Sequence, residues 1–360
     1  MSERVRAAVA VRQGTIEVQS FPLPEIGPRD MLVQVRLCGV CGSDLHLLRG
    51  DWGTPFPVIL GHEFVGTVAQ LGSEAREHHG VDVGDRVTVE MIVPCHECYW
   101  CRKGYYNLCA HDKKEGWEYG CNITCARPPH LWGGWAEYLY VPIQALVHRI
   151  PDHLPWEAAV LVEPLAVATR AVNLTPMLAG DTVAVVGPGT IGLLTTVAAK
   201  AAGAGTVILI GTRDSRLELG RALGADVLVN TARADARQEV LGVTGGRGAD
   251  VVFETAGTPA AQQQALELAR AGATVTILGL TGNRPVTLDL DRALMSPELR
   301  VQASFLSAWG YQGSIATLRS RRFPVEQLVT HVFPLEQAAQ AVRFSAQRLE
   351  DCVKVAIGVA

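Results

Sequence analysis

Alternation of apolar and polar residues dominates the first half of the chain. Stretches that alternate β-branched and polar side chains, a pattern typical of strands with one buried face, occur at 6–18, 31–37, 65–69 and 84–89. Proline at positions 22, 24 and 28 separates the first two, because proline cannot continue a strand ladder. No helical repeat of useful length occurs before about residue 155. The pattern predicts a compact β-rich domain.

The second half alternates apolar strands with helical segments. Strands are predicted at 181–186, 206–210, 248–254 and 272–280, with helices after the first two. Such repetition is typical of a doubly wound parallel sheet, whose ligands bind at the carboxyl ends of the strands. An alternative interpretation makes 182–211 a membrane span, but Lys200 and the interspersed glycines and prolines disfavour it. We therefore predict an α/β domain.

A glycine-rich motif follows the first strand of this domain. Gly187, Gly189 and Gly192, with Thr190 and Ile191 between them, lie between an apolar strand and a helix. This context predicts a dinucleotide site, because glycine lets the backbone approach a pyrophosphate at the start of a helix. Cofactor contacts are also expected after the later strands, at Ala256 and Gly279.

The end of the second strand bears on the choice of cofactor. An acidic residue there accepts hydrogen bonds from the ribose of NAD, but this chain has Gly211, followed by Thr212, Arg213 and Arg216. Guanidinium groups bind a 2′-phosphate well, so the segment favours NADP. In the alternative, Asp214 takes the acidic role or Arg213 is only solvated, and NAD is used.

Candidate metal ligands gather in the segment that leads from the second predicted strand. Cys41, Ser43, Asp44 and His46 lie within six residues, and His62 and Glu63 follow. A catalytic zinc takes about three protein ligands and keeps one position open, so Cys41 and His62 would need a third. Glu63 and Glu163 are the candidates for that place. In the alternative interpretation, Cys41 is a buried small residue and His62 a hydrogen-bonded loop residue.

A second cluster consists of four cysteines in fifteen residues. They are Cys95, Cys98, Cys101 and Cys109. Their short spacing predicts a closed tetrahedral zinc site, which is structural because no coordination position remains open. An iron–sulfur cluster fits the spacing less well, and a zinc finger would need a basic helix after the cysteines.

Composition narrows the classes of function. The chain has 360 residues, 48% of them hydrophobic, which is enough for two domains. A net charge of −4 and the absence of long runs of like charge argue against nucleic acid or anionic membranes as partners. Charged residues within Met1–Arg6 do not suit a signal peptide, so we expect a cytoplasmic protein with reduced thiols.

Together these motifs make the chain resemble the zinc-dependent medium-chain alcohol dehydrogenases, in the branch that includes polyol and threonine dehydrogenases. The resemblance covers essentially the whole chain. It implies a GroES-like catalytic domain at 1–165 and 307–360 and a Rossmann cofactor domain at 166–306. It also implies a small-molecule substrate and a homodimer or homotetramer.

The resemblance further implies roles for the individual residues. Cys41 and His62 would bind a catalytic zinc, with Glu163 favoured slightly over Glu63 as the further ligand. Ser43 and His46 would relay a proton, and Asp44 would orient a ligating imidazole.

The implied reaction is hydride transfer between a secondary alcohol or polyol and NAD(P). A threonine or sugar dehydrogenase is the alternative within the family. A non-catalytic binding protein on this fold would be expected to lack the zinc ligands, which are present here.

Several cysteines and tryptophans have no assigned role. Cys121 and Cys125 are four residues apart and would share a helix face, either as further metal ligands or as packing thiols. Trp117, Trp132 and Trp135 would either narrow a substrate pocket or pack in the core. Core positions are expected for the two remaining cysteines, Cys38 and Cys352.

Overall fold

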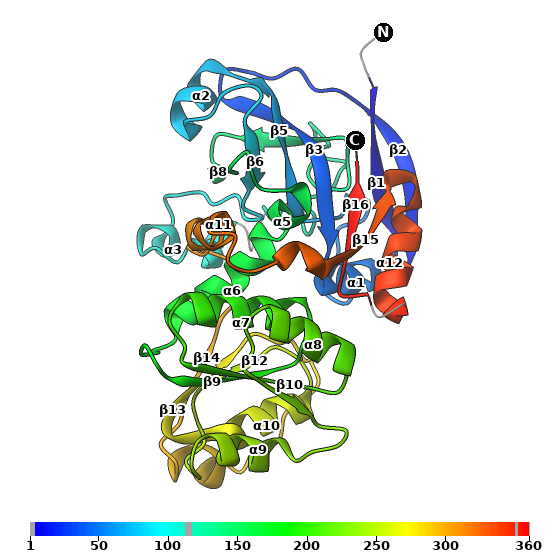
Figure 1. Cartoon of the computed structure of the whole chain (residues 1–360). Helices are drawn as coiled ribbons and strands as arrows, with labels where there is room; N and C mark the ends of the chain where they lie inside the picture. Colours follow the sequence, from blue (N-terminus) through cyan, green and yellow to red (C-terminus); the bar gives the residue numbers. More distant parts are fainter. Residues whose placement is uncertain (1–3, 112–116, 350–351, 360) are drawn as a thin grey trace. The chain divides into compact units, whose positions relative to one another are not determined.

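The computed structural model describes residues 4–111, 117–349 and 352–359. Met1–Glu3, on which part of the targeting prediction rests, lie outside the described residues. The chain divides into two compact units, of which the first comprises Met1–Glu163 and Glu326–Ala360 and the second comprises Pro164–Val325 (Figure 1).

The first unit is built mainly from strands. A three-stranded sheet has the order β2-β1-β4, and a second sheet has the order β15-β16-β3-β5-β6-β8, with β7 paired to β3. The strands are β1 (Arg4–Arg12), β2 (Thr15–Pro22), β3 (Asp30–Val40), β4 (Val58–Ile59), β5 (Glu63–Leu71), β6 (Arg86–Val89), β7 (Tyr138–Pro142), β8 (Val147–Arg149), β15 (Val329–Pro334) and β16 (Lys354–Gly358). The predicted β-rich domain is confirmed.

Two details of the first unit differ from the sequence prediction. The stretch 6–18 is a hairpin rather than one strand, because Gly14 adopts a φ of 73° and turns β1 into β2. Short helices also occur before residue 155. They are α1 (Gly42–Arg49), α2 (Ser73–His79) and α3 (Tyr99–Arg102), each too short to display a helical repeat. A 3₁₀ turn at Tyr106–Leu108 also lies before residue 155, and the helices of this unit after it are α5 (Trp156–Ala159), the 3₁₀ turn Leu335–Gln337 and α12 (Ala338–Gln347).

The second unit is a parallel sheet of six strands. They are β9 (Thr182–Val186), β10 (Thr206–Gly211), β11 (Val227–Asn230), β12 (Ala249–Glu254), β13 (Ala269–Ile277) and β14 (Arg300–Ala303). The spatial order is β11-β10-β9-β12-β13-β14, and every pair is parallel. This is the strand order of dinucleotide-binding folds, so the predicted doubly wound sheet is confirmed.

Helices cover both faces of this sheet. Figure 1 shows α7 and α8 on one face and α9 and α10 on the other. The helices are α7 (Thr190–Ala201), α8 (Asp214–Ala222), α9 (Ala236–Val243), α10 (Pro259–Leu268) and α11 (Tyr311–Arg319), with a π-helical turn at Asp291–Met295. Helix α6 (Val162–Leu174) and a 3₁₀ turn (Val325–Leu328) lie where the chain passes between the units.

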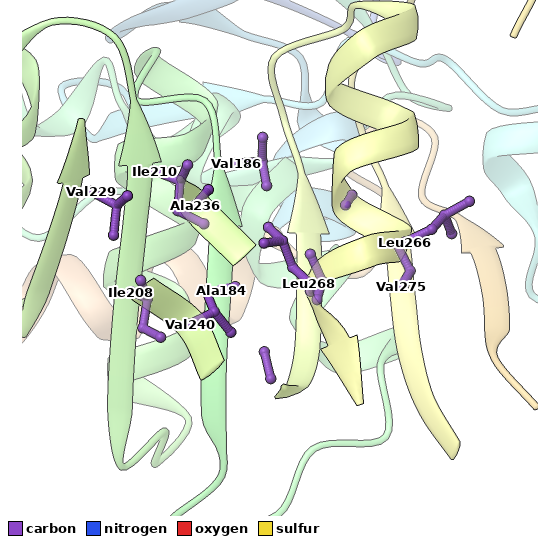
Figure 2. Packing of buried hydrophobic residues seen from close by; sticks show 13 residues of the cluster. Ala184, Val186, Ile208, Ile210, Val229, Ala236, Val240, Leu266, Leu268 and Val275 are labelled. Carbon is purple, nitrogen blue, oxygen red and sulfur yellow. The ribbon is translucent and has the colours of Figure 1, made fainter. Parts of the chain in front are cut away.

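Aliphatic side chains between the sheet and α9 and α10 form one core of the second unit (Figure 2). Val252 and Val275 are fully buried from two neighbouring strands, and Val240 and Ala265 are fully buried from the helices. Burying each large aliphatic side chain stabilises the fold by about 1.5 to 3 kcal/mol, so this core holds the strand ends in fixed positions.

The apolar stretch 182–211 forms β9, α7 and β10 rather than one long segment. Among the described residues, no helix combines the length and the apolar character that crossing a bilayer requires.

Candidate functional site

The first predicted metal ligand lies where β3 passes into α1. Cys41 is the N-cap residue of α1, and its backbone N–H donates to the Asp44 carboxylate at 2.8 Å. Asp44 thereby satisfies one of the amide groups that a helix start leaves unpaired. The short helix places Ser43 and His46 three residues apart, so both lie on one helix face.

His62 is buried immediately before β5, and its two ring nitrogens face different groups. Nε2 lies 3.3 Å from the Ser43 hydroxyl. Nδ1 lies 3.5 Å from the second oxygen of Asp44 and 3.8 Å from the Cys121 sulfur. Burial raises the pKa of Asp44 to about 6, although His62 opposes this shift. The structure thus places Asp44 behind the imidazole and Ser43 in front of it.

Glu63 forms a buried ion pair that the sequence did not predict. Lys354, the first residue of β16, donates from Nζ to both Glu63 oxygens, at 2.6 and 2.7 Å, and to the Val40 carbonyl at 3.2 Å. Burial is the largest influence and would lower the pKa of Lys354, but the nearby Glu63, Cys41 and Glu163 together raise that pKa. Gly39 is required opposite Glu63, because a Cβ there would collide with the carboxylate.

Three donors converge closely enough to hold one metal ion. The ligand atoms of Cys41, His62 and Glu63 all lie within 4.8 Å of one another. Among the residues that the structure describes, Glu163 does not belong to this set, although its charge contributes to the raised pKa of Lys354. A thiol, an imidazole and a carboxylate are donors that suit zinc, so the residues present fit this metal.

The four spaced cysteines also converge. Their sulfur atoms lie within 4.8 Å of one another, with Cys95 and Cys101 3.9 Å apart. The backbone N–H of Cys98 donates to the Cys95 sulfur at 3.3 Å, and that of Cys95 donates to the Cys109 sulfur at 3.4 Å. Backbone amides, first that of Ala110, lower the pKa of Cys98 to about 6. Such N–H donors favour thiolates, so this cluster fits a closed tetrahedral zinc site.

Cys121 and Cys125 do not share a helix face, because the segment around them forms turns. Cys121 lies against His62, whereas the backbone N–H of Cys125 donates to the Pro57 carbonyl. Both thiols are buried, and burial raises the pKa of each to about 11. In the described part of the chain neither belongs to a group of metal-ligating atoms.

The three tryptophans pack in different ways. Trp135 is fully buried, and its ring lies where a Cβ on Gly61 would collide with it. The Arg127 guanidinium lies over Trp117, 4.2 Å from the ring centroid, and Trp117 meets Trp132 edge to face. Cys38 and Cys352 are buried, as expected.

The glycine motif of the second unit adopts the close geometry that a dinucleotide requires. Gly187 follows β9 with a φ of 104°, and Gly189 is the N-cap residue of α7. Gly192 packs so tightly that an added Cβ would collide with the Gly187 carbonyl. Thr190 and Ile191 form the first turn of α7 between these glycines. The backbone at the helix start is therefore open to an anionic group, and the motif fits a pyrophosphate.

The ends of the neighbouring strands complete this edge of the sheet. Thr255, directly after β12, donates its hydroxyl to the Val186 and Gly187 carbonyls, both at 2.8 Å. Glu254 accepts from the backbone N–H groups of Ala256 and Gly257. A Cβ on Gly279, after β13, would collide with the Gly257 backbone. Buried polar groups thus hold Ala256 and Gly279 beside the motif.

Asp214 is engaged by two other side chains. Its carboxylate accepts from the Asn230 amide at 2.7 Å and forms an ion pair with Arg233. Arg213 is the N-cap residue of α8 and Arg216 lies in its first turn. Gly211 packs against the Pro188 ring, and Thr212 is exposed beside it.

Two residues that contact the site residues lie far from them in the sequence and were not predicted. Lys354 is 291 positions from Glu63, and Arg233 is 19 positions from Asp214. One signal was available for the first. A lysine within the otherwise apolar segment 352–359 must find a buried partner.

Comparison with known proteins agrees with this geometry. Residues 27–152 match the family described as "Alcohol dehydrogenase GroES-like domain", and residues 190–320 match "Zinc-binding dehydrogenase". The chain is 34% identical to the sorbitol dehydrogenase of Bacillus subtilis, over 99% of this chain and 97% of that protein. It is 36% identical to the L-threonine 3-dehydrogenase of Symbiobacterium thermophilum, over 95% of each.

Among solved structures, the chain is similar to a protein of Sinorhizobium meliloti described as a zinc-binding dehydrogenase and bound to NADP. The TM-score is 0.89 at 32% identity, over 99% of this chain and all of that one.

Proposed function

The chain belongs to the zinc-dependent medium-chain alcohol dehydrogenases, in their polyol-like branch, and on that premise we propose that it oxidises a secondary alcohol or polyol to the ketone with NADP as hydride acceptor. The observation that carries the proposal is the convergence of Cys41 and His62 beside the Ser43 hydroxyl. We infer that the first unit is the catalytic domain and that the second binds the cofactor.

We propose that Cys41, His62 and Glu163 hold the catalytic zinc, which when bound polarises the substrate oxygen. Glu63 is disfavoured because both of its oxygens already accept from Lys354. Recruiting Glu63 to a metal would divide its carboxylate between the metal and Lys354 and weaken the pairing of a buried ammonium, and this is costly. Asp44 orients His62 from behind, and Ser43 passes the substrate proton to His46.

A second, structural zinc is proposed at the four cysteines, which gives about two zinc ions per chain, one of them resistant to mild chelation. We also propose a homodimer or homotetramer, which sedimentation equilibrium would test.

NADP is proposed over NAD because Arg213 and Arg216 follow a glycine where an acidic residue would repel the 2′-phosphate. The engagement of Asp214 by Asn230 and Arg233 supports this choice. A threonine or sugar dehydrogenase is the second candidate, supported by the 36% identity to a threonine dehydrogenase, and differs only in substrate.

The test is formation of reduced cofactor by the zinc-loaded protein with a panel of secondary alcohols, polyols, sugars and threonine, each with NAD and with NADP. Turnover of a secondary alcohol or polyol with higher kcat/KM for NADP is expected. Turnover of threonine or sugars alone would favour the second candidate. No formation of reduced cofactor with any compound of the panel would contradict oxidoreductase activity and favour a binding protein.

A further inference from the structure

His46 is held by a carboxylate that no motif singled out. Its Nδ1 lies 2.8 Å from the Oδ2 atom of Asp51, five residues further along the chain. The imidazole also stacks on Trp52, with ring centroids 4.7 Å apart and an interplanar angle of 14°. The side chains of His46 and Asp51 are 26% and 37% exposed, so the pair reaches solvent.

The backbone explains why Asp51 meets His46. Helix α1 ends at Arg49, and Gly50 caps it in the left-handed conformation with a φ of 74°. This turn brings the backbone N–H of Asp51 to the His46 carbonyl at 3.0 Å. Asp51 therefore folds back over the last turn of the helix, on the side of His46.

Two contacts bear on which ring nitrogen carries hydrogen. The Asp51 carboxylate only accepts and lies 2.8 Å from Nδ1, whereas Nη2 of Arg49 only donates and lies 2.9 Å from it. Because Nη2 of Arg49 also lies 3.0 Å from Oδ2 of Asp51, it keeps an acceptor when the proton is on Nδ1, and this arrangement favours the Nδ1–H form. Nε2 then has a free electron pair in the neutral ring. Ser43 lies one turn earlier on the same helix face, so a proton that leaves Ser43 is on the side of α1 that carries His46.

The charges around the pair keep Asp51 ionised. Its hydrogen bond to His46, and then its contact with Arg49, lower the pKa of Asp51. Arg49 donates from Nε to Oδ2 at 3.0 Å, and its Nη2 lies 2.9 Å from Nδ1 of His46.

We propose that Asp51 is a positioning residue at the solvent end of the proton path, which holds His46 in the Nδ1–H form and accepts the Nδ1 proton for release to water. The inference rests on the proposed relay through Ser43 and His46. In alcohol oxidation the substrate O–H bond breaks and Ser43 gains that proton. Ser43 gives up its own hydroxyl proton, directly or through a bound hydroxyl group, to His46. An N–H bond forms at Nε2 of His46. The Nδ1–H bond then breaks toward Asp51, which passes the proton to water, and His46 is left neutral with hydrogen on Nε2. Exchange with water removes the Nε2 proton and returns one to Nδ1, which restores the Nδ1–H form for the next turnover.

The test compares Asp51→Asn with Asp82→Asn in the zinc-loaded protein. Asp82 is a matched control, because it also accepts from an arginine, Arg76, at 2.6 Å and is more exposed, at 61%. Asp51→Asn is expected to lower kcat roughly ten- to a hundredfold, the range for residues that act through another group, with unchanged cofactor Kd.

Asp51→Asn should also change two readouts that a purely structural role would not move. The solvent deuterium isotope effect should rise, and added imidazole should restore part of the rate. A wild-type kcat and isotope effect in Asp51→Asn, or a loss equal to that in Asp82→Asn, would overturn the inference.

NMR shifts of the His46 ring provide a readout independent of turnover. The Nδ1–H form is expected in the wild type and a mixture of forms in Asp51→Asn. A dominant Nε2–H form in the wild type would overturn the inference even if the variant folded poorly. His46→Ala distinguishes failure of the proposed relay through Ser43 and His46 from failure of the role proposed for Asp51. Full activity in that variant would end the proposed relay itself, whereas a slow His46→Ala beside a fast Asp51→Asn would end only the role of Asp51.

Discussion

Replacing Lys354 by methionine tests whether the buried ion pair between Lys354 and Glu63 stabilises the first unit. The side chains of Lys354 and Glu63 are only 4% and 1% exposed, and Nζ contacts both carboxylate oxygens. Methionine fills a similar volume without the charge, so Glu63 would stay buried and unpaired. Breaking a buried ion pair on one side costs about 3 to 5 kcal/mol, and we expect Lys354→Met to lose stability in this range.

A paired substitution isolates the cause of that loss. Lys354→Met combined with Glu63→Gln removes both charges, and this is expected to recover most of the stability. Arg76→Met is the matched control, because the Arg76–Asp82 pair has a similar distance but lies at the surface. It should cost about 1 kcal/mol or less.

Tryptophan fluorescence during guanidinium unfolding is a suitable assay. Six of the seven tryptophans lie within Met1–Glu163, so the signal reports mainly on the unit that contains Lys354. A loss in Lys354→Met no larger than that in Arg76→Met would refute the buried ion pair. It would also remove the reason for preferring Glu163 over Glu63 as the zinc ligand.

Three further substitutions test the remaining assignments. Cys109→Ser should lower the unfolding midpoint and the yield but not turnover per intact molecule, as measured by active-site titration; full stability with lost chemistry would reverse the assignment. Ser43→Ala should reduce kcat roughly a hundredfold or more, the scale for general acid–base groups. Wild-type rates there would leave Ser43 as a turn residue. Arg213→Ala should reduce kcat/KM for NADP roughly ten- to a hundredfold and leave that for NAD unchanged, since a charged hydrogen bond is lost. A clear NAD preference in both proteins would contradict the interpretation of this segment.

Motifs that are local in sequence were predictable. The four cysteines and the glycine motif were found because short spacing alone brings their atoms together, with little dependence on the rest of the fold. The parallel sheet was predictable for a related reason, since buried strands alternate with helices at short intervals.

Features that depend on strand register were not predictable. Lys354 reaches Glu63 because β16 and β5 both pair with β3, and nothing local specifies that neighbourhood. Helix α1 was not predicted because eight residues are too few to show a helical repeat. Its C-cap at Gly50 brings Asp51 to His46, so that contact was not predictable either. The spacing of Cys121 and Cys125 suggested a shared helix face, but the chain forms turns there.

The most direct test of metal-dependent chemistry at Cys41 and His62 is turnover and cofactor affinity measured in one preparation of Cys41→Ala. Cys38→Ala is the control, because it removes a buried thiol nearby that lies outside the ligand set. We predict that Cys41→Ala loses alcohol oxidation while its Kd for NADP is unchanged, and that Cys38→Ala keeps both. Retained turnover in zinc-free Cys41→Ala would contradict a role for this site in the reaction.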